Sequence, residues 1–401
     1  MDSSDVSGIR IVDDVIMIMS PGTREVVVIG GGIIGCTTAY YLTRHPSAPS
    51  AKITLIEASK HGPAQGASGK AGGLVARWAY PKELVDVSFD EHVRLAEEHN
   101  GKDRWGWRFV NCGSWEGRGQ VTQQEEEGLG VVGNKDLEKT MGLPGGKKPT
   151  RRSRVSKNSL PSDLMWVQDE LTHAYTPMAQ DGETAQVHPY LFTTSMFELA
   201  KERGLTYING QATKVVFANG QVTGVQFIDP ETKQTKSLSA THVILAAGAW
   251  SPSIIKHLPI SAIRAHSITV RPREGVPIAP YALFTKINDP ASGGVSSPEI
   301  YARPDNEVYA CGPGDDCILP ETVDDVVVDQ AYCDLIYKYI SSISTEIREG
   351  KVERRQACFL PIVSAENISG PIIEEAANMA RGLYIGTGHT CWVSLYEDLK
   401  L

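Results

Sequence analysis

The sequence lacks the features that mark membrane-spanning, secreted and metal-binding proteins. Residues 26–42 carry no charge, but glycines interrupt this stretch, so it does not resemble a membrane span. The apolar stretch at residues 15–19 is too short for a secretion signal. The seven cysteines form no CxxC pair, and the ten histidines show no metal-ligand spacing. We therefore expect reduced thiols, no bound metal, no membrane span and a cytoplasmic protein.

Positive charge is also scarce. The formal net charge is −9, and an acidic surface repels polyphosphate, so we expect no nucleic-acid partner. One basic run, residues 147–157, stands among Pro, Ser and Gly. We interpret this run as a solvated loop; a localisation signal or a contact with an anionic surface is the alternative.

What is present is a strand–turn–helix–strand pattern near the N-terminus. Residues 25–30 (EVVVIG) form a continuous apolar run of the kind buried in a parallel sheet, and residues 52–57 (KITLIE) form a second one. The spacing predicts a helix from residue 32 to about residue 44 between them. The fold class we predict is α/β, with a Rossmann-like lobe interleaved with a mostly antiparallel-sheet lobe.

The turn after the first strand carries a dinucleotide-binding pattern. Gly30, Gly32 and Gly35 give G-x-G-x-x-G, and each glycine serves a separate purpose: a tight turn, close approach of a pyrophosphate, and close helix–strand packing. Ile33 and Ile34 begin the helix, whose N-terminal N–H groups attract phosphate. Glu57 ends the second strand and can accept hydrogen bonds from ribose hydroxyls. A glycine-rich turn in an unrelated α/β protein is the alternative.

These glycines do not distinguish FAD from NAD. Residues 66–73 (GASGKAGG) are small enough to let the backbone pass close to a flat ring or a phosphate, whereas a flexible linker would have the same composition.

The remaining sequence suggests an interleaved organisation. A helix is expected at residues 190–203, short strands near 206–208, 212–217, 222–228 and 242–247, a helix near 323–345 and a last strand at 383–386. We divide the chain into an N-terminal extension (1–24), a first part of the nucleotide lobe (25–115), a partly irregular insertion (116–185), a second part of the nucleotide lobe (186–262), a substrate lobe (263–351) and a C-terminal part of the nucleotide lobe (352–401).

Several motifs together resemble the FAD-dependent oxidoreductases of the D-amino-acid-oxidase superfamily, which includes glycine and sarcosine oxidases. The motifs are VVVIGGGIIG, Glu57, GASGKAGG, HVILAAGAW (242–250) and GLYIGTGHTCW (382–392). GKAGG and RQACFLP (355–361) are most similar to a fungal branch, which includes a yeast oxidoreductase linked to late-endosome-to-Golgi transport. The resemblance implies FAD as the cofactor and endosome association as an alternative to a purely cytoplasmic location.

The resemblance also implies roles for particular residues. The three glycines would hold the pyrophosphate and Glu57 the adenosine ribose. The flavin side would be bordered by Ser68, Gly69, Lys70, Ala71, Gly72 and Gly73. Further cofactor contacts are expected from Val215, Ala247, Gly248, Trp250, Gly388 and His389.

Other side chains have competing interpretations. His389 is a candidate catalytic residue at the flavin, or a hydrogen-bonded turn histidine. Trp250 and Trp392 are stacking partners or core aromatics. Arg303, at a predicted strand end, could pair with a substrate carboxylate and is the second catalytic candidate. Lys286 and Arg355 are weaker candidates, and for all three cations a surface position is the alternative.

The C-terminal sequence departs from the family pattern. The family continues from the late histidine into a Gly- and Pro-containing turn and a last helix, whereas residues 392–401 read WVSLYEDLKL. The binding of adenosine and pyrophosphate would survive this difference. The difference affects how the protein adjusts the reactivity of the flavin, and with it the turnover of substrate. Cys391 is a weak candidate for covalent attachment of FAD.

Three functional hypotheses follow. The first is an FAD-dependent oxidoreductase that oxidises an amine or amino acid by hydride transfer to the flavin. The second is a weakly catalytic or non-catalytic flavoprotein that acts in endosomal trafficking or as an interaction factor. The third, an NAD-dependent dehydrogenase, requires only the N-terminal unit.

Overall fold

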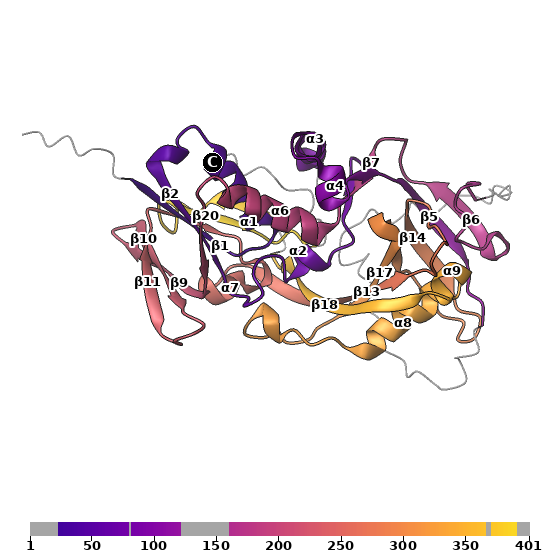
Figure 1. Ribbon diagram of the computed structural model, residues 1–401. Coiled ribbons are helices and arrows are strands. Elements are labelled where there is room, and N and C mark those ends of the chain that lie inside the picture. The colour runs from indigo at the N-terminus through magenta and orange to yellow at the C-terminus, as the bar shows by residue number, and fades with distance from the viewer. Residues whose placement is uncertain (1–22, 80–81, 122–159, 366–369, 391–401) are drawn as a thin grey trace, which may run out of the picture.

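The computed structural model describes residues 23–79, 82–121, 160–365 and 370–390. Figure 1 shows an elongated molecule with a nucleotide-binding type of sheet at one end and an antiparallel-type sheet at the other. Among the described residues, no helix has both the length and the apolar character that crossing a bilayer requires.

A six-stranded sheet forms the first lobe. Its order is β19 (Ile372–Glu375), β20 (Leu383–Thr387), β12 (His242–Leu245), β1 (Arg24–Ile29), β2 (Ala51–Glu57) and β8 (Thr206–Asn209). All neighbouring strands are parallel except β19 and β20. The chain runs from β1 through helix α1 (Ile33–Arg44) to β2, so the predicted βαβ unit is present.

Both faces of this sheet are covered, which explains why β1 is apolar and buried from Val26 to Ile29. Val26 and Val28 pack against α1 and α6 (Pro189–Lys201). Val27 and Ile29 alternate onto the other face, against a three-stranded sheet of β11 (Thr235–Ser239), β10 (Gln221–Ile228) and β9 (Gln211–Ala218).

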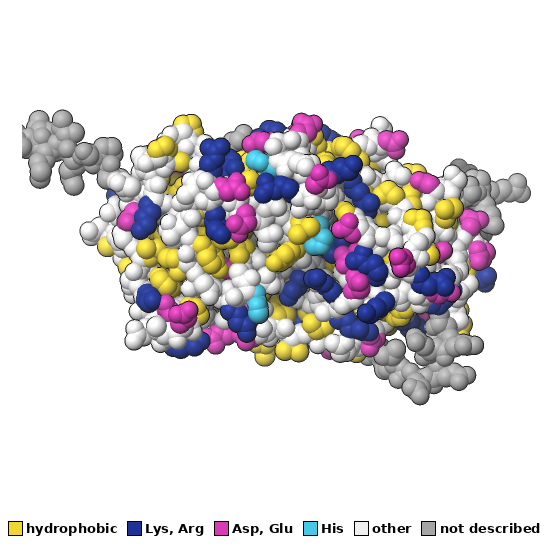
Figure 2. All heavy atoms as spheres, viewed as in Figure 1, with side chains coloured by type: hydrophobic (Ala, Val, Ile, Leu, Met, Phe, Trp, Pro, Cys, Tyr) yellow, Lys and Arg dark blue, Asp and Glu magenta, His cyan; other side chains and the backbone are white. Residues whose placement is uncertain are grey.

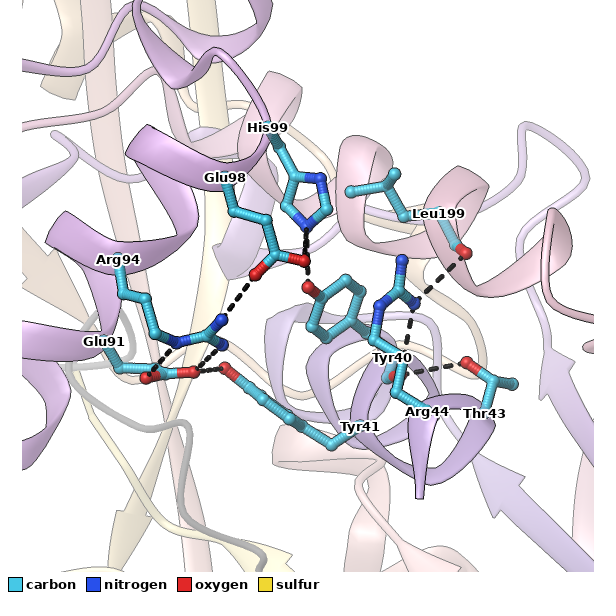
Figure 3. A network of polar contacts seen from close by, with 9 residues as sticks. All are labelled: Tyr40, Tyr41, Thr43, Arg44, Glu91, Arg94, Glu98, His99 and Leu199. Carbon is cyan, nitrogen blue, oxygen red and sulfur yellow. Dashed lines mark hydrogen bonds and ion pairs between the residues drawn. The ribbon is translucent and has the colours of Figure 1, made fainter. Parts of the chain in front are cut away.

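Helix α3 (Lys82–Glu98) is attached to α1 by a polar network (Figure 3). The Tyr41 hydroxyl donates to Glu91, which also accepts from Arg94. Tyr40 hydrogen-bonds His99 at 2.6 Å. Because these contacts join residues about 50 positions apart, they fix α3 and the short helix α4 (Gly101–Trp105) on the nucleotide lobe.

The second lobe is an eight-stranded sheet. Its main path is β18 (Lys351–Val363), β13 (Ile260–Arg271), β17 (Glu307–Asp315), β16 (Glu299–Arg303), β14 (Tyr281–Asn288), β5 (Asn111–Arg118) and β6 (Thr172–Pro177), and β15 (Val295–Ser296) pairs with β14. The pairs are antiparallel except β14 with β5. Helices α8 (Gln330–Ser341) and α9 (Thr345–Arg348) pack on one face.

Some segments lie in a different sheet or lobe from the one that the sequence predicts. β5 and β6 come from residues expected in the first nucleotide segment and the insertion, yet both lie in the eight-stranded sheet. β7 (Thr184–Gln186) pairs with β3 (Leu74–Ala76) and β4 (Arg108–Phe109). The basic run at 147–157 lies outside the described residues.

The helix expected near residues 323–345 is shorter in the structure. Thr322 and Asp325 form a capping box on a single 3-10 turn, and Asp329 caps α8 afterwards. The residues between β17 and α8, 316–329, therefore form a mainly irregular connection, which we call the strap.

Candidate cofactor and active site

An open cavity lies at the carboxyl ends of β1, β2 and β12, with about 1040 Å³ of empty space when its solvent-filled mouth is included. The segments that follow these strands border it: residues 30–34, Glu57 with Ala58, and residues 246–250. This edge is where open α/β sheets bind their ligands. No cluster of His, Cys, Asp or Glu among the described residues could hold a metal ion.

Gly30 and Gly35 of the first turn are sterically required. Gly30 has φ +109°, and a Cβ there would lie 2.4 Å from the Ala246 carbonyl oxygen. A Cβ on Gly35 would lie 1.9 Å from the Gly30 carbonyl oxygen, so this glycine allows the helix to approach the strand. Gly32 precedes α1 and faces the Ser68 hydroxyl. Gly30, Gly32, Ile33 and Ile34 border the cavity, and Gly35 supports them from behind.

Glu57 is held by backbone N–H groups at the end of β2. Its two carboxylate oxygens accept from Gly31 N at 2.5 Å and from Ser59 N at 2.7 Å. Burial raises the pKa of Glu57, and these hydrogen bonds oppose the rise. A carboxylate fixed at this place can accept from ribose hydroxyls, as predicted.

The small-residue segment is ordered and compact rather than a flexible linker. It contains helix α2 (Ala67–Lys70), and the Ser68 hydroxyl accepts from Ile33 N at 2.9 Å. The Lys70 ammonium donates to the Ala357 carbonyl at 3.0 Å, and burial lowers its pKa. Of the six residues predicted here only Ser68 borders the cavity; Gly69, Lys70, Ala71, Gly72 and Gly73 lie behind it, against the second lobe and α6.

The opposite end of the cavity is lined mainly by aromatic and small side chains. Trp250 borders it, donates from Nε1 to the Pro320 carbonyl at 2.9 Å and meets Phe359 edge to face. Ala247 and Gly248 also border the cavity.

His389 borders this end of the cavity as well, whereas Gly388 does not. The ring of His389 is buried, and burial lowers its pKa to about 3. The imidazole is therefore neutral at physiological pH and offers a hydrogen-bonding group rather than a positive charge. Trp392, Cys391 and the rest of the atypical C-terminus lie outside the described residues.

Val215 does not reach the cavity. It is buried between the two sheets of the first lobe, whereas Gln211 and Ala212 border the cavity at the start of β9. A strand advances about 3.3 Å per residue, so Val215 lies roughly 10 Å beyond Ala212. In this strand Gln211 and Ala212 border the cavity, and a cofactor contact of Val215 stays a prediction.

Arg303 is also absent from the cavity lining. The side chain is buried, pairs with Glu307 at 3.0 Å and donates to the Ala71 carbonyl. Its guanidinium lies 4.6 Å from the centre of the Tyr309 ring. Because these internal partners occupy it, the structure does not support a carboxylate-binding role. Lys286 and Arg355 pair with Glu116 and Asp334.

The strap is one part of the site that sequence reasoning missed, beside Gln211, Ala212, Phe359 and Pro361. Its residues Glu321, Thr322 and Val323 border the cavity, although they belong to the connection after β17. Asp324 accepts from the Ser59 hydroxyl at 2.6 Å and from Lys60 N at 2.9 Å. The strap thus joins the second lobe to the end of β2. The only sequence signal was the capping pattern from Thr322 to Asp325.

We expect Asp324→Asn to raise the rate of FAD dissociation about tenfold. The substitution weakens two hydrogen bonds to a charged acceptor, and 1.4 kcal/mol corresponds to a factor of ten. Flavin fluorescence after dilution measures the release. The control is Asp325→Asn, since Asp325 caps the strap's own turn. Equal dissociation rates in wild type and Asp324→Asn would contradict a clamping role.

The fold and the cavity define a Rossmann-type dinucleotide-binding protein with an attached antiparallel lobe. A family model described as FAD dependent oxidoreductase matches residues 25–393. The chain belongs to this family, and its cofactor is FAD. The cavity fits that cofactor, because Glu57 stands at one end, the glycine turn in the middle and a surface of mainly aromatic and small side chains at the other.

Relatives extend over nearly the whole chain. "Putative oxidoreductase TDA3" of Saccharomyces cerevisiae is 32% identical over 93% of this chain and 89% of its own. "Putative oxidoreductase C1F5.03c" of Schizosaccharomyces pombe is 30% identical over 92% and 90%. Glycine oxidase from Geobacillus kaustophilus shares the fold, with a TM-score of 0.63 at 16% identity over 94% of this chain and 92% of that one. Iminodiacetate oxidase from Chelativorans has a TM-score of 0.62 at 18% identity, over 92% and 91%.

Proposed function

We propose that this protein oxidises a small amine or amino acid with bound FAD. The observation that carries the proposal is the continuous cavity that runs from Glu57 to the surface around His389. Support comes from the neighbours of the same fold, which include glycine oxidase, iminodiacetate oxidase and L-proline dehydrogenase. When bound, FAD supplies the hydride acceptor.

This chain's own residues would bind and orient the cofactor. Backbone N–H groups of the glycine turn would hold the pyrophosphate, and Glu57 the ribose. Trp250, Phe359 and Pro361 would exclude water from the flavin end, and neutral His389 would offer a hydrogen bond without a competing charge.

Anaerobic mixing of the purified yellow protein with a panel of amines and amino acids tests the proposal. We expect loss of the visible flavin absorbance with at least one compound, and its return when air is admitted. A flavin that stays oxidised with every compound would favour the non-catalytic trafficking or interaction role. A colourless protein that retains nicotinamide cofactor would contradict both.

A further inference from the structure

The strap borders the cofactor cavity although it belongs to the second lobe. In Figure 1 it is the orange segment along the lower edge of the molecule, between the end of β17 and the start of α8. Two hydrogen bonds hold it against the first lobe: Asp324 accepts from Ser59, and Pro320 accepts from Trp250. The residues between these two anchors, 321–323, all border the cavity. A ligand in the cavity would therefore contact a segment of the second lobe.

The Asp324 anchor lies at the end of the cavity where Glu57 stands. Ser59 and Lys60, which donate to Asp324, are two and three residues after Glu57 in the sequence. Ser59 N also donates to the Glu57 carboxylate at 2.7 Å. Burial raises the pKa of Glu57, and the nearby negative charge of Asp324 contributes to the rise. The strap is thus attached beside the residue predicted to bind ribose.

Small and aliphatic side chains line the cavity next to this anchor. A Cβ on Gly66 would lie 3.6 Å from Cγ2 of Val323, so the strap packs against the small-residue segment there. Gly210 N donates to the Glu57 carbonyl at 2.8 Å, which places Ala212 on the same side of the cavity. In the part of the chain that the structure describes, no Lys or Arg borders the cavity. Apolar walls beside a carboxylate suit an uncharged ring attached to a sugar.

The charge of the strap shows which part of a dinucleotide it can favour. Residues 316–329 contain five Asp or Glu and no Lys or Arg. Figure 2, in the same view as Figure 1, shows acidic and basic side chains mixed along this lower edge, so no basic patch on this face offsets the negative charge. Such a segment repels phosphate. A favourable contact between the strap and a dinucleotide must therefore involve an uncharged part of the ligand.

We infer that the strap recognises the adenosine half of FAD, with Val323 and Ala212 as apolar contacts for adenine and Asp324 as the anchor that holds Val323 beside Glu57. A ligand with adenosine and a pyrophosphate but no flavin is then sufficient to order the strap. ADP is such a ligand, whereas FMN has the flavin and lacks adenosine. The inference concerns the binding of the cofactor, so it does not rest on the proposed function.

Full-length protein from which the flavin has been removed tests the inference with ADP and FMN. Calorimetric titration gives the two dissociation constants, and we expect ADP to bind at least tenfold more tightly than FMN. Hydrogen exchange of peptides that cover residues 316–329 reports on the strap itself. We expect ADP, but not FMN, to slow this exchange at least tenfold, because a ligand that contacts a segment lowers the rate at which its backbone opens.

Variants in the strap locate the contact. Val323→Ala should weaken the binding of ADP and of FAD about tenfold and leave FMN unchanged, since it removes apolar surface that only adenosine contacts. Val327→Ala is the matched control, the same change in the same strap at a side chain that is 70% exposed and does not border the cavity. It should bind all three ligands like wild type.

Three outcomes overturn the inference. The first is binding of FMN as tight as that of ADP, or tighter. The second is a Val323→Ala variant that loses as much affinity for FMN as for ADP, because the loss would then be general. The third needs no variant and decides alone if Val323→Ala does not fold: ADP binds to wild type and leaves the exchange of residues 316–329 unchanged. Reduction of the flavin by amines, or its absence, bears only on the proposed function.

Discussion

Gly30→Ala is expected to weaken FAD binding at least 100-fold and to yield a nearly colourless protein. Two effects combine at this position. A φ of +109° is strained for any residue with a Cβ, and the added methyl group would lie 2.4 Å from the Ala246 carbonyl oxygen. The turn must therefore move, and with it the N–H groups that hold the pyrophosphate. The ratio of flavin to protein absorbance after gel filtration measures the loss.

Gly204→Ala is the matched control. Gly204 also has a positive φ, +95°, but a Cβ added there would have no atom within 4 Å. This variant should lose roughly 1 kcal/mol of stability and keep FAD. If both variants lost FAD equally, the effect of Gly30→Ala would be backbone strain alone, and the close contact with Ala246 would have no role.

The free energy of unfolding should fall steeply as the pH drops from about 6.5 to about 4. Burial lowers the pKa of His188 and of His266 to about 4 and that of His389 to about 3. In that window the unfolded chain binds protons that the folded chain does not, so stability rises with pH and levels off above about 6.5. Each histidine should contribute on the order of 2–3 kcal/mol. Urea unfolding at a series of pH values measures the slope.

His266→Gln should flatten this dependence, since its Nε2 accepts from Asp329 N at 3.1 Å and would lose that role on protonation. His173→Gln, at an exposed position, serves as the control and should leave the slope unchanged. A stability profile that is flat between pH 7 and pH 4 would contradict the burial of these rings.

Local patterns were sufficient to predict the nucleotide lobe. The apolar runs of β1 and β2, the glycine turn and Glu57 lie within about 30 residues, so their geometry depends on contacts near in sequence. The α/β class was predicted correctly on this basis, whereas FAD and the family were predicted correctly from the resemblance of motifs spread along the chain. Trp250 and His389 border the cavity, and their contacts with FAD stay predictions.

Features that depend on contacts between distant segments were not predictable in this way. The strap reaches Ser59 from 265 residues away in the sequence, and no local pattern records that contact. Arg303 looked available because its partner Ala71 lies 232 residues away. The cofactor contact of Val215 was inferred from its match to a strand position of the family, and such a match does not show which end of the strand borders the cavity.

The pairing of β13 with β18 has a consequence for motion. The pairing runs from Ile260 with Val363 to Arg271 with Lys351, with one register shift between Thr269 and Val270, and Phe359 and Pro361 of the same ribbon border the cavity. A hinge between the lobes would have to bend both strands of this paired ribbon together. Substrate should therefore enter by displacement of peripheral loops while the lobes stay fixed, and the distance between labels placed at the two ends of the molecule should not change when a ligand binds.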